Sequence, residues 1–268
     1  MKNWRIYNGA LIPLTPPHLE VVTSDIKLNI LDENVFFARW TTNFDIQKET
    51  EFWYVINDAP VDIEGYSKNT RSKIRRGLNK CSVKKISREE LMKKGFDSYR
   101  MAFLSYNTYI NAKTKSEFVK EINLLSNNWE FWGIFHEDKM IGYSQNKIIK
   151  DYCEYSTIKF HPKYLKYYPS YALFYTMNKY YLNSNNFKYV NDGARSISHE
   201  TNIQEFLIQK FKFRKAYCEL HLVYSRRIKL LIMMMLPFRS VLKFFNLGVI
   251  KKLNILLKQE LIRKSFNY

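Results

Sequence analysis

Residues 129–160, WEFWGIFHEDKMIGYSQNKIIKDYCEYSTIKF, decide the fold class of this chain. Aromatic and β-branched residues are frequent in three segments, Trp129–Phe135, Met140–Ile149 and Tyr152–Phe160, and short polar turns separate them. Short connections between segments rich in β-forming residues are typical of antiparallel hairpins. The stretch therefore predicts a three-stranded antiparallel meander.

The elements on both sides of the meander extend it to a mixed sheet. Downstream, the pattern predicts a helix at Pro169–Leu182 and a strand at Phe187–Asn191. A second helix at Asn202–Phe211 and a strand at Lys215–Tyr224 follow. Upstream, it predicts a strand and two helices, at Ser82–Ile86, from Ser87 to about Phe103 and at Lys115–Leu125. Strands that flank one helix are usually parallel. We therefore expect an α/β (α+β) fold with a mixed, mostly antiparallel central sheet flanked by helices.

The two ends of the chain differ from this central part. Residues 1–65 contain short predicted strands, at Arg5–Leu14, Lys27–Leu31, Asn34–Thr41 and Phe52–Ile56. A helix capped by Ser67 or Asn69 follows them. We predict three parts: a β-rich N-terminal module at 1–65, a central domain at 66–225 and a helical tail at 226–268.

The composition is that of a globular protein with an anionic partner. Of the 268 residues, 46% are hydrophobic and 25% are charged, which is ordinary for a folded chain. Only 8 glycines are present, which argues against folds that bind nucleotides through glycine-rich loops. The net charge is +18, and the tail holds ten lysines and arginines against the single acid Glu260. Such an excess predicts a membrane surface, a nucleic acid or a phosphorylated ligand as partner.

The cysteines and histidines predict neither disulfides nor a metal site. Cys81, Cys153 and Cys218 are far apart and odd in number, which is typical of a reducing cytoplasm. The five histidines lack metal-ligand spacing, so we predict no metal. No signal peptide and no run of 18 apolar residues is present, so we expect a cytoplasmic protein, peripheral at the inner face of the membrane.

The tail carries an apolar pattern with helical rhythm. The stretch Ile228–Leu236 is far too short to span a bilayer, and Pro237 ends it. From Val241 to Leu261, apolar residues alternate with lysines. This pattern predicts attachment to anionic lipid, and packing of the tail on the rest of the protein is the alternative.

Three segments carry a resemblance to a known family. The segment 158–173, IKFHPKYLKYYPSYAL, follows the last strand of the meander, and DGAR at 192–195 precedes SHETNIQEFLIQKFKFR at 198–214. With the element order, they resemble the GNAT acyltransferase superfamily, especially its Fem-type and polysaccharide-locus relatives. The segment 67–76, SKNTRSKIRR, is similar to the Arg-rich helix that precedes the transferase domain in Fem-like proteins. The resemblance implies a GNAT-like acyltransferase domain at 66–225.

The resemblance also implies where the donor binds. In the superfamily, a loop and the following helix N-terminus hold the pyrophosphate of the cofactor, and exposed N–H groups at a helix start suit this task. The matching donor-binding residues here are Lys163, Lys166, Ser170, Tyr171 and Asn202. Tyr168 and Ser170 stand where the superfamily has glycines. Asn202 has an alternative role as a helix cap.

Charged residues are the candidates for binding the acceptor. Arg71 and Arg75 lie one turn apart, so together they can clamp a phosphate or carboxylate, and a solvated helix face is the alternative. Arg195 and Glu200 complete the predicted substrate-binding set.

Acyl transfer also needs a base for the proton of the attacking group. We predict Glu154, Asp192 or His199 as base, because burial raises the pKa of a carboxyl toward neutrality, and Tyr217 as the donor of a proton to the departing thiolate. A carboxylate here can equally be the ion-pair partner of Arg195 or Lys159.

Three functions follow from these observations. The first is a GNAT-type N-acyltransferase of EC class 2.3 that moves an acetyl-like group from acetyl-CoA or another acyl-CoA to an amine or hydroxyl of a small or glycan-linked acceptor, as in bacterial glycan biosynthesis. The second is a Fem-like aminoacyl transferase that uses aminoacyl-tRNA, because transfer RNA is a polyanion. The third is a non-catalytic GNAT-like module that binds lipid or nucleic acid. All depend on whether the helix that begins near Pro169 points its N-terminus at an anionic donor.

Overall fold

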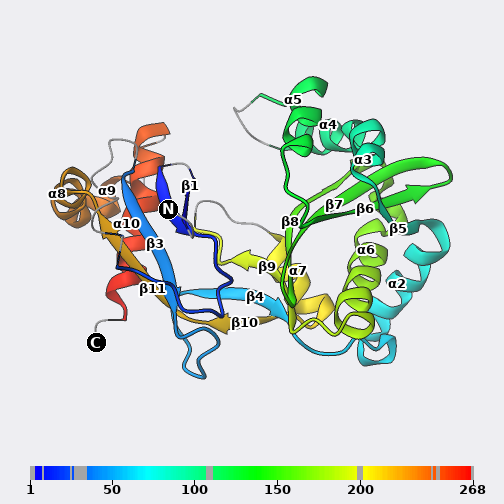
Figure 1. Ribbon diagram of the computed structural model, residues 1–268, viewed down its shortest axis with the longest axis horizontal. Helices are drawn as coiled ribbons and strands as arrows, with labels where there is room; N and C mark the ends of the chain where they lie inside the picture. The colour runs from blue at the N-terminus through cyan, green and yellow to red at the C-terminus, as the bar shows by residue number, and fades with distance from the viewer. Residues whose placement is uncertain are drawn as a thin grey trace. The chain divides into compact units, whose positions relative to one another are not determined.

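A computed structural model describes residues 4–7, 9–24, 26, 35–106, 111–197, 202–242, 244–245 and 248–266 (Figure 1). The chain forms two compact units. Unit 1 comprises residues 1–54, 194–201 and 215–268, and unit 2 comprises residues 55–193 and 202–214. The N-terminal segment and the tail thus belong to the same compact unit, while the division at 65 and 225 stays a prediction.

The seven-stranded sheet contains the predicted meander. Its strand order is β10-β4-β9-β8-β7-β6-β5. The bounds are β4 Trp53–Asn57, β5 Ser82–Ile86, β6 Trp129–His136, β7 Lys139–Ile149, β8 Tyr152–Phe160, β9 Tyr189–Ala194 and β10 Arg214–Tyr217. Strands β5 to β8 are antiparallel neighbours, and β9 joins β8 in parallel. The predicted mixed, mostly antiparallel sheet is confirmed.

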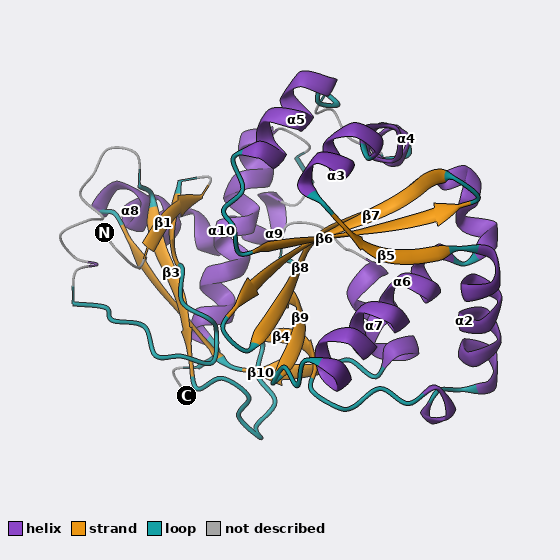
Figure 2. Cartoon of the chain, turned by 45° about the vertical axis from the view of Figure 1, so that its right-hand side comes forward, coloured by secondary structure: helices purple, strands orange, loops and turns teal. Residues whose placement is uncertain are grey.

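Helices cover both faces of this sheet in unit 2. Figure 2 shows α3, α4 and α5 on one face of β5–β8, and α2 and α6 on the other. The bounds are α2 Lys68–Lys80, α3 Arg88–Lys94, α4 Phe96–Leu104, α5 Lys115–Asn123, α6 Pro169–Asn178 and α7 Asn202–Phe211. Shorter turns are the 3₁₀ helices η1 Ile63–Gly65 and η2 Pro162–Tyr167, and the π-helical η3 Lys179–Ser184, which continues α6.

Local side-chain signals set the helix starts. Ser67 accepts a hydrogen bond from the Thr70 amide, and Ser87 accepts one from the Glu90 amide, as the capping pattern predicts. The predicted single helix from Ser87 is wrong in one respect, because Gly95 divides it into α3 and α4. A Cβ at Gly95 would lie 2.6 Å from Leu91 Cδ1, so this close packing requires a glycine.

An aromatic core fixes the helices α3 to α5 on the sheet. Its buried residues are Ile86, Leu91, Tyr99, Phe118, Ile122, Phe131, Phe135, Met140 and Tyr143. The rings of Tyr99 and Phe118 are stacked with centroids 5.5 Å apart. Burial of such large apolar side chains is the main stabilising contribution in a domain of this size.

Unit 1 contains a four-stranded sheet of order β1-β2-β3-β11. Its strands are β1 Trp4–Tyr7, β2 Ala10–Pro13, β3 Phe37–Thr42 and β11 Glu219–Tyr224. The predicted strand Arg5–Leu14 is instead the hairpin β1–β2, because Gly9 has a φ of 76° and reverses the chain. The predicted strand Lys27–Leu31 lies outside the described residues.

The predicted strand Lys215–Tyr224 is also two strands. The break falls at Cys218, after which β11 pairs antiparallel with β3 in the four-stranded sheet. The Cys218 amide donates to the Phe52 carbonyl, and the Thr50 hydroxyl donates to the Cys218 carbonyl. These bonds hold the chain where it leaves one sheet for the other.

The tail is helical, as expected. It contains α8 Arg226–Met235, the 3₁₀ helix η4 Leu236–Phe238, α9 Arg239–Leu242 and α10 Gly248–Lys264. Helix α10 packs on unit 1, since Ile262 joins the core cluster of Phe37, Phe52 and Leu220. Leu257 of α10 is buried as well, so this helix packs on the rest of unit 1, while much of α8 is exposed. Attachment of the tail to anionic lipid stays a prediction.

Candidate active site

The neighbouring strands β8 and β9 separate from each other next to the polar residues Glu154, Asn191 and Asp192. The parallel pairing of β8 with β9 covers Tyr152 to Glu154 on β8 and ends where Glu154 lies opposite Asn191. Both strands continue beyond this point. Diverging strands at the carboxyl end of a parallel pair are where ligands bind in α/β folds.

Asp192 is the first residue of β9 beyond this pairing. It is half-buried, and burial of its carboxyl group raises the pKa to about 7. Among the described residues, Asp192 has neither an ion-pair partner nor a hydrogen bond from its side chain. A carboxyl group poised near neutrality can accept a proton in a reaction at physiological pH.

Gly193 leaves space beside this carboxyl group. Its φ is +93°, a conformation that favours glycine, and its amide donates to Asn191 Oδ1 at 2.8 Å. A Cβ built on Gly193 would have no atom of the described residues within 4 Å. The backbone next to Asp192 is therefore open to a ligand.

A buried tyrosine lies behind the diverging strands. The Tyr155 hydroxyl donates to Asn178 Oδ1 of α6 at 2.7 Å. Burial raises the pKa of Tyr155, and the negative charge of Asp192 adds to this effect. Tyr155 therefore stays neutral and links β8 to α6.

The first turn of α6 is an uncapped helix N-terminus. Pro169 is its first residue, and no side chain in the described part of the chain accepts from its amides. Tyr168 precedes it in the left-handed conformation, with φ 57° and ψ 43°. Pro169 is buried, whereas Tyr168 and Ser170 are half-buried.

Helix α2 lies beside α6 (Figure 2), and two of its cations lie next to this turn. The Arg76 guanidinium lies 4.7 Å from the ring centroid of Tyr168 and donates to its hydroxyl. Lys73 Nζ lies 5.8 Å and 5.5 Å from the ring centroids of Tyr168 and Tyr171. Helix dipole and cations together favour an anionic group here.

Gly77 allows this close approach of α2 to α6. A Cβ at Gly77 would lie 2.7 Å from the Tyr168 carbonyl oxygen and 3.2 Å from Ala172 Cβ. Gly77 is therefore a packing residue.

The predicted donor-binding residues divide into three groups. Lys163 and Lys166 are exposed in η2, and neither forms an ion pair within the described part of the chain. Ser170 lies in the first turn of α6, while the Tyr171 ring packs in the core against Phe206. Asn202 is the exposed first residue of α7.

The predicted acceptor clamp is formed, but it holds an internal carboxylate. Arg71 and Arg75 both bind Glu64, at 2.7 Å and 2.8 Å. Arg195, in unit 1, binds Glu51 at 2.8 Å, and its guanidinium lies 4.4 Å from the Trp53 ring centroid. Each of the three arginines thus already has a carboxylate partner.

The remaining predicted residues lie apart or outside the described part. Glu154 lies on β8 at the last paired position before the strands separate. Tyr217 belongs to unit 1, where its ring packs edge-on against Trp53, and burial followed by the charge of Glu49 raises its pKa. His199 and Glu200 fall outside the described residues.

Lys73, Arg76 and Tyr155 were not predicted. The signal for the first two is the position of Gly77, because a glycine within a helix marks the face of closest packing. Arg76 precedes Gly77 directly, and Lys73 lies one turn before Gly77 on the same face of the helix.

Neither thiols nor metal ligands gather in the described residues. All three cysteines are buried, and burial raises the pKa of Cys81 to about 11 and that of Cys218 to about 12. A thiolate is therefore disfavoured at neutral pH. No group of three His, Cys, Asp or Glu side chains within the described ranges has the arrangement of a metal site.

Solved structures share this fold. FemX superposes with a TM-score of 0.56 at 10% identity, covering 76% of this chain and 75% of FemX. The C-terminal domain of a protein assigned as a lysylphosphatidylglycerol synthetase, from Agrobacterium fabrum, superposes with a TM-score of 0.52 at 10% identity, covering 87% of this chain and 84% of that domain. The chain has the predicted GNAT-like mixed α/β fold.

Sequence comparison adds nothing to this likeness in fold. No family model matches the chain, and no curated protein matches it. Among the described helices, none is sufficiently long and apolar to cross a membrane.

Proposed function

We propose that this protein is an acyl-transfer enzyme in which Asp192 accepts the proton of the attacking amine or hydroxyl. The observation that carries the proposal is the carboxyl group with a pKa of about 7 at the point where β8 and β9 separate. A structural carboxylate would normally have a cation or several donors beside it, and Asp192 has none among the described residues.

The reaction needs few groups from the protein. The acceptor attacks the acyl carbon, its new C–N or C–O bond forms, and its proton passes to Asp192 as the bond to the carrier breaks. The carrier leaves as a thiol or hydroxyl and takes up one proton. A base of this kind contributes on the order of 10²-fold to 10⁴-fold to the rate.

The donor has an anionic part that suits the first turn of α6. This turn offers the Ser170 amide, the helix dipole, and the cations Lys73 and Arg76. Lys163 and Lys166 add exposed charge in η2. Our first candidate for the donor is an acyl thioester of coenzyme A, whose pyrophosphate would bind at this turn.

An aminoacyl-tRNA is the second candidate, and a specific observation favours it. Tyr168 occupies the left-handed position before α6, where the superfamily has glycine, and its half-buried ring lines the turn. This ring limits the approach of a compact pyrophosphate, whereas exposed bases and the sugar-phosphate backbone of RNA bind well to aromatic rings and cations. The likeness in fold to FemX and to the lysylphosphatidylglycerol synthetase domain supports the same candidate.

Binding measurements separate the two donors. Acetyl-CoA is titrated by calorimetry and aminoacyl-tRNA by filter binding over a series of salt concentrations. Lys73→Glu combined with Arg76→Glu should weaken binding of the true donor by tenfold or more, on the order of one phosphate contact each. Lys80→Glu, in the last turn of the same helix, is the matched control. Absence of binding for both donors would overturn the proposal.

A further inference from the structure

The outer face of α8 in unit 1 is apolar, although it is exposed. Ile232 is buried, and Ile228 and Met235 are half-buried, so these three positions form the inner face. Leu230, Met233 and Met234 lie on the other side of the helix, where a globular protein normally has polar residues.

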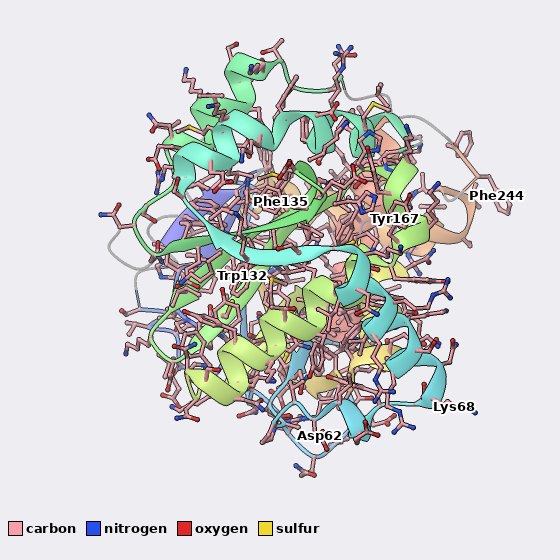
Figure 3. The ribbon with its side chains drawn as sticks, turned by 90° about the vertical axis from the view of Figure 1, so that its right-hand side faces the viewer. Asp62, Lys68, Trp132, Phe135, Tyr167 and Phe244 are labelled. Carbon is pink, nitrogen blue, oxygen red and sulfur yellow. The ribbon has the colours of Figure 1, made fainter. Side chains whose placement is uncertain are left out.

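This apolar surface continues beyond the end of α8. We define the α8–α9 surface by six exposed side chains: Leu230 (58% exposed), Met233 (64%), Met234 (54%), Phe238 (60%), Phe244 (88%) and Phe245 (51%). Figure 3 shows Phe244 projecting outward from its segment. These side chains belong to α8, to η4 and to the segment after α9, and large exposed apolar side chains in neighbouring segments mark an interaction site.

The charged side chains that the structure describes on α8 and α9 are all cations. Arg226, Arg227 and Lys229 are exposed on the first turn of α8, and Arg239 begins α9. The Nε atom of Arg239 is buried and has no hydrogen-bond partner among the described residues. The surface therefore complements an anionic partner.

The single acid of the tail does not offset this charge at the surface. Glu260 is buried, accepts from Arg263 at 2.7 Å and 2.9 Å, and accepts from the Tyr224 hydroxyl at 3.0 Å. These three bonds satisfy the carboxylate internally. A second copy of the chain is thus a poor partner, because it would bring two basic surfaces together.

A hollow lies at the C-terminal end of α8. Its volume is about 390 Å³, and its lining residues are Ile232, Met233, Leu236, Pro237, Glu260 and Lys264. Four of the six are apolar, and Lys264 is exposed at the edge of α10. An acyl chain or part of a headgroup fits such a lining better than a base or a sugar does.

We propose that the α8–α9 surface docks on the anionic face of a phospholipid bilayer. The apolar side chains enter the boundary between headgroups and acyl chains, and Arg226, Arg227 and Lys229 bind lipid phosphates. This is the pattern of an interfacial helix and not of a membrane-spanning one. The proposal is independent of the acyl-transfer function and does not require activity for its test.

Substitutions in the full chain test the docking. Deletion of the tail is unsuitable, because Ile262 and Leu257 of α10 are buried in the cores of unit 1. The measurement is co-flotation with vesicles of phosphatidylcholine alone or mixed with phosphatidylglycerol. The wild-type chain should float with the mixed vesicles, and added salt should weaken its binding.

Two variants with matched controls separate the apolar and the charged contribution. The triple serine variant carries Leu230→Ser, Met234→Ser and Phe238→Ser. It should bind vesicles more weakly by tenfold or more, on the order expected when apolar surface is no longer buried in the membrane. Leu104→Ser with Leu124→Ser and Leu165→Ser changes three equally exposed side chains of unit 2 and should have no effect. Arg226→Gln with Arg227→Gln should cost about fivefold per charge, and Lys120→Gln with Lys179→Gln is its control.

The docking is overturned if the wild-type chain does not float with the mixed vesicles, or if the triple serine variant floats as well as the wild-type chain. It is also overturned if a variant and its control lose the same amount of vesicle binding. Self-association of the wild-type chain that the triple variant abolishes, without vesicle binding, would instead assign the surface to a second copy. All substituted residues are exposed, so thermal unfolding of each variant should match that of the wild-type chain and show that folding is retained.

Discussion

Two basic regions of the molecule, the first turn of α6 with α2 and the outer face of α8, differ in what surrounds their charges. In the first, Lys73 and Arg76 lie over the rings of Tyr168 and Tyr171, beside an uncapped helix N-terminus. In the second, Arg226 and Arg227 lie on one helix with exposed aliphatic side chains.

The comparison shows that the side chains around a cation indicate the kind of anionic partner better than the positive charge itself does. Aromatic faces, helix amides and fixed cations form a local site for one anionic group. Cations spread among flexible exposed apolar side chains suit an extended, fluid surface. The net charge of +18 by itself indicates neither.

The largest effect is expected from Asp192→Asn, on β9 in the candidate active site. It should separate catalysis from docking on vesicles. Because the amide cannot accept a proton, the turnover rate should fall on the order of 10²-fold to 10⁴-fold, while vesicle binding stays unchanged. On the proposed function, the rate of the wild-type chain should fall as the pH drops below about 7, because protonation then removes the base. Asp138→Asn, in an exposed turn, is the control. A rate that is unaffected by Asp192→Asn would exclude it as the base.

Charge reversals in the two regions should give opposite results. Lys73→Glu with Arg76→Glu should weaken donor binding by tenfold or more and leave flotation unchanged. Arg226→Glu with Arg227→Glu should do the reverse, with a loss of flotation on the order of tenfold or more. Both assays are run on both variants. If either pair of reversals affected both assays alike, the two regions would not be separate sites.

The smallest effect is expected from Gly77→Ala, which tests the packing that holds α2 beside α6. A new Cβ would meet the Tyr168 carbonyl oxygen at 2.7 Å, and backbone moves less easily than a side chain. Strain of about 1–3 kcal/mol outweighs a gain in helix propensity of about 1 kcal/mol, so the free energy of unfolding should fall slightly. Asn79→Ala, exposed in the same helix, should raise it instead. Denaturant unfolding of both variants provides the comparison.

Elements with local signals were predictable from the sequence. The meander, the caps at Ser67 and Ser87, and the helix Asn202–Phe211 depend on residues a few positions apart. The hairpin at Gly9 and the break at Cys218 were missed. Asn8-Gly9 carried a usable turn signal, whereas the break depends on bonds to Phe52 and Thr50, which lie far away in the sequence.

The candidate site follows the same division. Asp192 could be singled out because it directly follows the predicted strand Phe187–Asn191 of a βαβ unit, and its role as the base stays a prediction. The ion pairs of Arg71 and Arg75 were not predictable, since their partner Glu64 belongs to a separate turn, η1. Lys73 and Arg76 were missed because the face of α2 that meets α6 is set by a tertiary contact at Gly77.

The pairing of β3 with β11 also has a consequence for synthesis on the ribosome. Phe37 lies opposite Tyr224 in this ladder, so the sheet cannot close until most of the chain has emerged. Unit 2 consists mainly of the continuous segment 55–193 and has its partners available earlier. During this interval the edge of β3 that later pairs with β11 is unpaired, so we expect it to be a place where the nascent chain can pair with a wrong strand.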